Sequence, residues 1–68
     1  MRRRFRALRE AKDLTQGQLA VLVGVKHATI NKIEAGTRKP SVDVALRLQS
    51  ILDSSIDDLL VKDSDKLA

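Results

Sequence analysis

Apolar residues recur along most of the chain at intervals of three and four, which is the period of an amphipathic α-helix. The strict alternation of apolar and polar residues that marks a β-strand is nearly absent. Capping and turn-forming residues interrupt the helical pattern and divide it into about five short segments. We expect helices over residues 2–12, 15–24 and 27–35, a fourth starting near Ser41, and a short fifth after Ser55. The pattern therefore predicts an all-α fold.

The second segment has a clear start. Thr15 is followed three residues later by Gln18, the spacing of a capping box, in which each side chain bonds the other residue's backbone N–H. Leu14 and Leu19 occupy the two positions of a hydrophobic staple around that cap. Gly24 is placed to end the helix. These signals predict a second helix that begins at Thr15 and stops at Gly24.

The second and third segments together predict a helix-turn-helix unit. Each has about eight residues, and a turn of three or four residues at Gly24 joins them. Ala20 is small enough to let the two helices cross closely, while Ile30 and Ile33 anchor the third helix and leave its opposite face outward. Gly36 suits the left-handed conformation that commonly follows a helix.

The apolar pattern also predicts which side chains are buried. In the first two segments these are Phe5, Leu8, Ala11, Leu19, Ala20, Leu22 and Val23. The apolar positions of the fourth helix are Val42, Ala45, Leu46, Leu48 and Leu52, and Val44 and Ile51 widen this arc beyond one face. Together with Leu60 and Val61 they exceed what one small core needs, so we expect some of these four residues at the contact between two copies of a homodimer.

Composition and charge narrow the class of protein. The 68 residues make one domain, with no cysteine for a disulfide or a thiolate metal site. Residues 1–50 carry 11 basic and 4 acidic side chains, whereas residues 51–68 carry 2 basic and 5 acidic ones. This asymmetry indicates a face that meets a polyanion, although ordinary surface charge would give a similar count. Phe5 is the only aromatic residue, which favours duplex DNA over single strands that need stacking platforms.

Several other classes find no support in the sequence. With no cysteine, one histidine and no glycine-rich phosphate loop, no nucleophile–base pair can be assembled, so we expect no enzyme and no cofactor. His27 has no cysteine or histidine at metal-ligand spacing. No apolar run approaches the roughly 18 residues of a membrane span, and no signal peptide follows the basic start. We therefore expect a cytoplasmic protein with no membrane association and no small-molecule domain.

At this point the order of residues becomes recognisable. The ordered series is Leu8-Arg9, Leu14-Thr15-Gln16, Leu19-Ala20, Gly24-Val25, Thr29-Ile30, Ile33-Glu34, Gly36, Pro40-Ser41 and Leu59. It resembles the Cro and lambda-repressor-like helix-turn-helix family over about residues 5–61. The resemblance implies a compact five-helix domain whose third helix enters the major groove. The sequence departs from the family's pattern at Lys26, where Ser or Thr is usual, at Gln49, where a small residue is usual, and at Asp53, where Gly is usual.

The resemblance also implies roles for particular residues. Its base-reading positions map onto Lys26, His27, Ala28 and Lys32, with Thr29 and Asn31 at the margin. Lys and His can donate to guanine N7 and O6, and Ala28 can pack on a thymine methyl group. Phosphate contacts are expected from Gln16, Asn31, Arg38 and Lys39. Arg38 and Lys39 could equally form a hydrophilic turn.

The two ends of the chain carry separate expectations. Residues 1–4 could form a basic arm whose Arg2, Arg3 and Arg4 contact the DNA backbone or a minor groove, or a solubilising end. Residues 62–68 form a polar tail.

Arg9 and Glu34 form an expected pair. Glu34 lies near the end of the third helix, where the dipole disfavours an anion, so it needs a compensating cation. The resemblance implies a partly buried salt bridge between the two; two unrelated surface charges are the alternative.

These observations predict a sequence-specific regulator of transcription, a repressor that binds an inverted repeat of duplex DNA as a homodimer. The alternatives are an antitoxin-type partner protein or a protein-interaction module with the same fold. A basic outer face on the third helix opposes the last of these.

Overall fold

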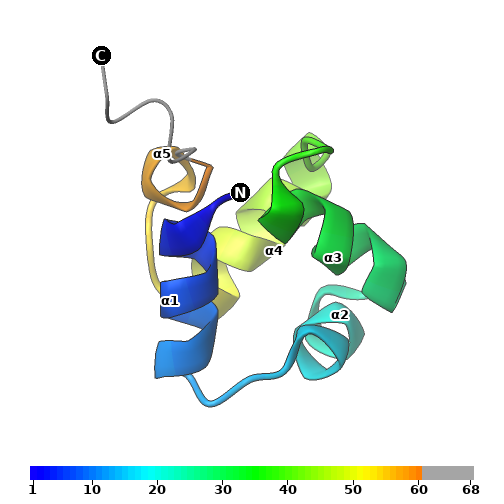
Figure 1. The fold of residues 1–68 in the computed structure, drawn as a ribbon, viewed down its shortest axis with the longest axis horizontal. Helices are drawn as coiled ribbons and strands as arrows, with labels where there is room; N and C mark the ends of the chain where they lie inside the picture. The colour runs from blue at the N-terminus through cyan, green and yellow to red at the C-terminus, as the bar shows by residue number, and fades with distance from the viewer. Residues whose placement is uncertain (61–68) are drawn as a thin grey trace.

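A computed structural model describes residues 1–60 of the chain and shows five α-helices (Figure 1). Their bounds are α1 Arg3–Ala11, α2 Gln16–Val23, α3 His27–Ala35, α4 Val42–Leu52 and α5 Ile56–Leu59. The described residues contain no strand. The all-α prediction is confirmed, and each helix lies within a residue or two of where the sequence placed it.

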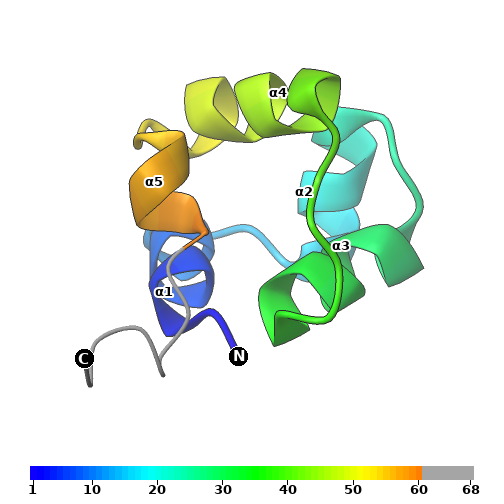
Figure 2. The same ribbon diagram turned by 90° about the horizontal axis from the view of Figure 1, so that it is seen from above.

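The five helices form two pairs joined by a bridging helix (Figures 1 and 2). Helices α2 and α3 pack closely on each other, as a helix-turn-helix requires, and α1 lies beside α5. Helix α4 runs between the two pairs and contacts both α2 and α5. This arrangement leaves one side of α3 uncovered by any other helix (Figure 2).

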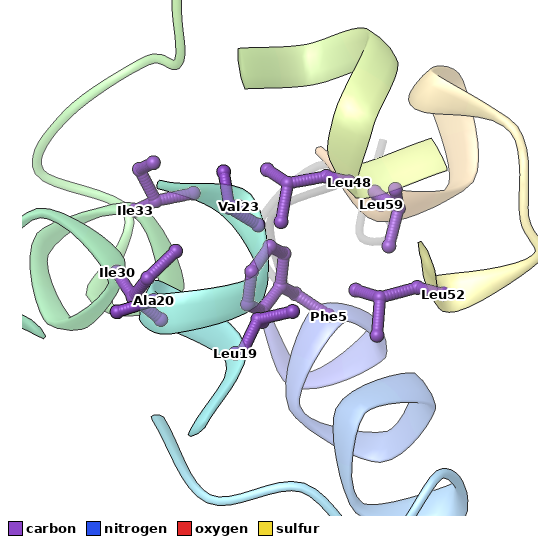
Figure 3. Close-up of a cluster of buried hydrophobic side chains, with 9 residues drawn as sticks. All are labelled: Phe5, Leu19, Ala20, Val23, Ile30, Ile33, Leu48, Leu52 and Leu59. Atoms are coloured by element: carbon purple, nitrogen blue, oxygen red, sulfur yellow. The ribbon is translucent and has the colours of Figure 1, made fainter. Parts of the chain in front are cut away.

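Nine apolar side chains from all five helices make the core (Figure 3). They are Phe5, Leu19, Ala20, Val23, Ile30, Ile33, Leu48, Leu52 and Leu59. Phe5, the single aromatic residue, lies between the α2 and the α4–α5 side chains (Figure 3). Because the core draws on every helix, its burial couples the five elements into one domain.

Two of the predicted core positions in α1 and α2 are wrong. Ala11 is exposed, because the buried face of α1 that contains Phe5 continues one period on at Arg9 instead. Leu22 is 56% exposed, because α2 turns its Leu19–Ala20–Val23 side inward. Both errors come from reading every apolar residue as part of the buried stripe.

Side-chain caps begin three of the helices, as their sequences indicate. The capping box at α2 is complete: Thr15 Oγ1 accepts from the Gln18 backbone N–H at 3.0 Å, and Gln18 Oε1 accepts from the Thr15 N–H at 2.9 Å. Ser41 accepts from the Val44 N–H in the same way. The cap at α5 is Ser55, which accepts from the Asp58 N–H.

The ends of α2 and α3 are equally well defined. Gly24 and Gly36 adopt left-handed conformations with φ of 84° and 87°. A side chain at either position would be strained, which confirms the predicted helix stops. Next to Gly24, Arg47 Nη1 donates to the carbonyl of Val23 at 2.9 Å and so ties α4 to the end of α2.

Two residues that depart from the family pattern, Gln49 and the C-cap Asp53, lie at the end of α4. Asp53 takes the left-handed position with φ of 53°, which Asp tolerates better than most residues other than Gly and Asn. Gln49 Oε1 accepts from the backbone N–H of Ile56, the first residue of α5, at 3.1 Å. These contacts set the turn between α4 and α5 without the residues that the family pattern favours.

Helix α4 faces inward through a different stripe from the one that its apolar excess suggested. Val44 and Ile51 are partly buried against the core, whereas Val42 and Leu46 are 76% and 56% exposed. The surplus apolar surface of α4 therefore lies at Val42 and Leu46. Leu60 is half-buried. Val61 and the polar tail 62–68 lie outside the described residues.

Candidate nucleic-acid interface

Helix α3 separates its side chains into an inner and an outer set. Ile30 and Ile33 are fully buried in the core, and Glu34 is 4% exposed. The predicted base-reading residues lie on the other side: Lys26, His27, Ala28 and Lys32 are exposed, as is Asn31, and Thr29 is half-buried. The structure thus brings the sequence-predicted recognition residues together on the free surface of one helix.

The surface around α3 carries positive charge without exposed negative charge. Between residues 14 and 42 the chain has one carboxylate, Glu34, and that side chain is buried. The cations of the same segment are exposed: Lys26 and Lys32 on α3, and Arg38 and Lys39 in the loop before α4. Such a surface attracts a polyanion over its whole extent.

Glu34 is neutralised from inside the molecule. Arg9 Nε donates to Glu34 Oε1 at 2.8 Å, and Arg9 Nη2 donates to Oε2 at 3.3 Å. The expected pair is therefore present, and it is bidentate. Arg9 Nη1 also donates to the Leu14 carbonyl at 2.6 Å, so one guanidinium ties α1 both to α3 and to the loop that precedes α2.

The partners of Arg9 favour its protonated form. The hydrogen bond to Glu34 raises the pKa of Arg9 above its ordinary value; burial lowers it, and the charges of Glu34 and Glu10 add to the increase. The guanidinium therefore stays protonated at every pH at which the protein is folded.

Gln16, the first residue of α2, connects this buried pair to the outer surface of α3. Its Nε2 donates to Glu34 Oε2 at 2.8 Å. Its Oε1 lies 3.1 Å from His27 Nε2 and accepts from Asn31 Nδ2 at 3.2 Å. The sequence predicts a phosphate contact for Gln16 but not these bonds to Glu34, His27 and Asn31, because they depend on how closely α2 and α3 cross.

The N-terminus of α3 lacks a side-chain cap. Lys26 stands at the N-cap position and its side chain accepts no hydrogen bond, since an ammonium group has only donors. The first-turn N–H groups of α3 and the Lys26 ammonium thus occur at the same end of the helix. Both favour an anion at that end.

For Arg2, the structure contradicts the predicted basic arm, whereas Arg3 and Arg4 are exposed and their DNA contacts stay a prediction. Arg2 is 1% exposed, and its Nη1 donates to the carbonyls of Ile33 at 2.6 Å and Arg38 at 2.9 Å. Its Nε donates to the carbonyl of Leu60 at 3.3 Å, and its backbone N–H donates to that of Glu34 at 2.8 Å. A side chain held in this way is not available to DNA phosphates.

The neighbouring arginines belong to α1. Arg3 begins that helix, and Arg4 forms an exposed ion pair with Asp58 at 3.2 Å. Arg2 caps the last carbonyls of α3, where the helix dipole favours a cation. A signal for this role was present: Arg2, Phe5 and Arg9 are spaced three and four residues apart and share one helical face.

The sequence profile of the helix-turn-helix family matches residues 5–59, which include all five helices. The chain belongs to this helix-turn-helix family. Proteins of the family bind DNA and are not enzymes, and the prediction that this chain is not an enzyme is confirmed. The resemblance inferred from the ordered residues is likewise confirmed.

Individual relatives agree with this assignment. An uncharacterized HTH-type transcriptional regulator of Archaeoglobus fulgidus is 36% identical over 67 residues, which cover 98% of this chain and 96% of the relative. One from Methanocaldococcus jannaschii is 30% identical over 97% of this chain and 100% of its own length. A protein of Methanocella arvoryzae, named as an HTH-type transcriptional regulatory protein, is 45% identical over 52 residues, which are 76% of this chain but 16% of that longer protein. No solved structure matched significantly.

Two features are absent from the described residues 1–60. These residues contain no group of three or more metal-ligating side chains that could hold an ion. None of their helices has the length and hydropathy needed to span a bilayer.

Proposed function

We propose that the protein is a transcriptional repressor that binds an inverted repeat of duplex DNA as a homodimer, with α3 of each copy in the major groove. The observation that carries the proposal is the surface formed by the start of α2, the outer side of α3 and the loop 36–41. It exposes four cations, and its only carboxylate is buried against Arg9. A protein-interaction face would have no need of such one-sided charge.

The proposal assigns different tasks to the two parts of this surface. Side chains at the start of α3 reach base edges, and these are Lys26, His27, Ala28, Thr29 and Lys32. Gln16, Asn31, Arg38 and Lys39 surround them and contact phosphates. Arg38 and Lys39 have more freedom for this than Arg2, because both side chains are exposed.

The homodimer rests on the apolar surface that one copy leaves uncovered. Val42 and Leu46 are exposed on α4, and Ile51 and Leu60 are only half-buried, in a domain too small to carry much stability in reserve. A two-fold dimer places its two recognition helices about one turn of DNA apart, so the operator half-sites share that spacing.

The decisive experiment is selection of bound sequences from a random duplex pool, followed by titration at several salt concentrations. We expect an inverted repeat with half-sites about 10 base pairs apart between centres. The logarithm of affinity should fall with the logarithm of salt with a slope of several units, at about −0.9 per phosphate neutralised.

Two results would contradict the proposal. An affinity that stays flat from low to high salt would exclude DNA as the ligand of this surface. A single half-site, recovered together with a monomeric mass at micromolar concentration, would exclude the dimer. Repression is then tested by placing the selected site across a reporter promoter.

A further inference from the structure

We infer that Glu34, although buried, sets the base preference of His27 by fixing the direction of the Gln16 amide and thereby the tautomer of the imidazole ring. The inference rests on the proposed function, since it takes His27 to be a base-reading residue. Its first part concerns the free protein alone and holds or fails without DNA.

We call the chain of contacts from Glu34 through Gln16 to His27 the relay. It begins with the chemistry of a carboxylate. The Glu34 side chain, ion-paired with Arg9, has acceptor oxygens and no donor. The group of Gln16 that faces Oε2 at 2.8 Å must therefore be its NH₂. Because the amide is planar and its two ends differ, the carbonyl oxygen of Gln16 is forced to point the other way, toward the exposed surface of α3.

The second step passes this direction to the histidine ring. Gln16 Oε1 lies 3.1 Å from His27 Nε2 and 3.2 Å from Asn31 Nδ2. A carbonyl oxygen can only accept, so His27 Nε2 carries the proton. In the neutral ring this leaves Nδ1 with a lone pair. That atom belongs to an exposed side chain and makes no hydrogen bond within residues 1–60.

The third step concerns the base that such a ring can read. An acceptor at Nδ1 matches the amino groups of adenine N6 and cytosine N4, which are the donors of the major groove. It does not match guanine, whose N7 and O6 are both acceptors. The relay thus replaces the expectation from residue type alone, in which His27 donates to guanine.

The tautomer can be measured directly by nitrogen-15 NMR of the imidazole ring. His27 is the only histidine in the chain, so the imidazole nitrogen signals belong to it without residue assignment, and their couplings to the two ring carbon-bound protons distinguish Nδ1 from Nε2. In the neutral ring of the free protein we expect Nε2 to be protonated and Nδ1 to be bare. A predominance of the Nδ1–H form would overturn the inference at once.

The isosteric variant Glu34→Gln reverses the relay. The new amide can keep its oxygen toward Arg9 Nε, where the shorter bond lies, and then presents NH₂ to Gln16 and to Arg9 Nη2, whose 3.3 Å bond is lost. The Gln16 amide must then reverse, and the Asn31 amide reverses with it to present its oxygen. Gln16 then offers a donor to His27 Nε2, so the proton moves to Nδ1. We expect the Nδ1–H tautomer to become the major form and the preferred base to change from adenine or cytosine to guanine, with a change in relative affinity of about fivefold to thirtyfold.

Two more variants separate this relay from a purely structural effect of Glu34. Gln16→Ala removes the link while leaving Arg9–Glu34 in place, so the tautomer bias should weaken and the base preference at this position should broaden. It also keeps the test available if Glu34→Gln does not fold. Arg2→Met is the matched control, since it loosens the same last turn of α3 without touching Gln16; it should leave the tautomer ratio unchanged.

The outcomes decide between the two levels of the proposal. A tautomer that stays the same in Glu34→Gln and in Gln16→Ala refutes the relay, whatever the DNA binding. A tautomer that changes while the base preference does not refutes the readout by His27. A protein that shows the expected tautomers but binds no duplex refutes the proposed function and leaves the intramolecular relay standing.

Discussion

Arg2 and Arg9 lie seven residues apart on the same face of the N-terminal segment, and both bind the last turn of α3, but their partners differ. Arg9 faces a carboxylate, Glu34, in a bidentate ion pair. Arg2 faces backbone carbonyls, among them those of Ile33, Arg38 and Leu60. One arginine thus neutralises a buried charge, and the other closes the end of a helix.

The difference determines what each contact contributes. Removing one member of an ion pair leaves the other as an uncompensated buried charge, which is expensive. Among the described residues, the acceptors that lose Arg2 on its removal are neutral carbonyls, and some of these can bond to water if the segment opens slightly. The stability of Arg9 and that of Glu34 therefore depend on each other. Loss of Arg2 costs less, because water can replace it as a donor to the carbonyls that it caps.

The largest effect is expected for Glu34→Ala. This variant leaves the Arg9 guanidinium, whose side chain is 10% exposed, without its counterion. It also removes the acceptor of Gln16 Nε2. We expect the free energy of unfolding to fall by about 3 kcal/mol, the low end of the range for breaking a buried pair. Urea denaturation followed by circular dichroism measures it. An unchanged midpoint would show that the pair contributes nothing net.

A double variant sharpens this result. Arg9→Met together with Glu34→Leu replaces both charges with apolar groups of similar length. It should lie within about 1 kcal/mol of the parent, because the desolvation cost of the pair disappears with the pair. A double variant as unstable as the single one would mean that shape rather than charge governs this site.

Arg2→Met is expected to have the next largest effect. Methionine retains most of the apolar stem but donates no hydrogen bonds, so the carbonyls of Ile33 and Arg38 lose this donor, and of the donors in the described residues Ile33 keeps only the Gly36 backbone N–H. We expect a loss of about 2 kcal/mol of unfolding free energy, measured in the same way. If Arg2 were instead a DNA-contacting arm, the variant would keep its stability and lose salt-dependent affinity.

The smallest effect concerns the opposite end of α3. Lys26→Ser supplies the missing N-cap and removes a cation from the positive end of the dipole, so it should stabilise the free protein by about 1 kcal/mol. DNA binding should weaken at the same time. A loss confined to operators with one particular base pair indicates base contact, and a uniform loss with a salt slope lower by about one indicates phosphate contact. Unchanged affinity would leave Lys26 with no role in recognition.

Much of the fold could be predicted because local signals agreed with the tertiary structure. The capping box at Thr15 and Gln18 and the left-handed stops at Gly24 and Gly36 are decided by neighbouring residues, so the sequence is enough. The pairing of Arg9 with Glu34 could be suggested because an anion near a helix C-terminus needs a compensating cation, and the family resemblance pointed to Arg9.

What could not be predicted depends on how the helices cross. Arg2 is buried because the end of α3 and Leu60 converge on it; its spacing from Phe5 and Arg9 indicates the helical face that it shares with them but not these partners. The same is true of Gln16, whose three partners all come from α3. In both cases charge or polarity suggested a solvent-exposed role; geometry replaces it with an internal role for Arg2 and adds an internal role for Gln16.

The bond from Arg2 to the carbonyl of Leu60 spans 58 positions of the sequence, nearly the whole described chain. Through it, transient opening of α5 removes one of the acceptors that hold Arg2, and release of Arg2 frees the carbonyls that end α3. Local unfolding at the two ends of the described chain should therefore lower the stability of the last turn of α3. In hydrogen exchange, the amides of the last turn of α3 should open together with those of α5, as one cooperative unit rather than as the fraying end of an isolated helix.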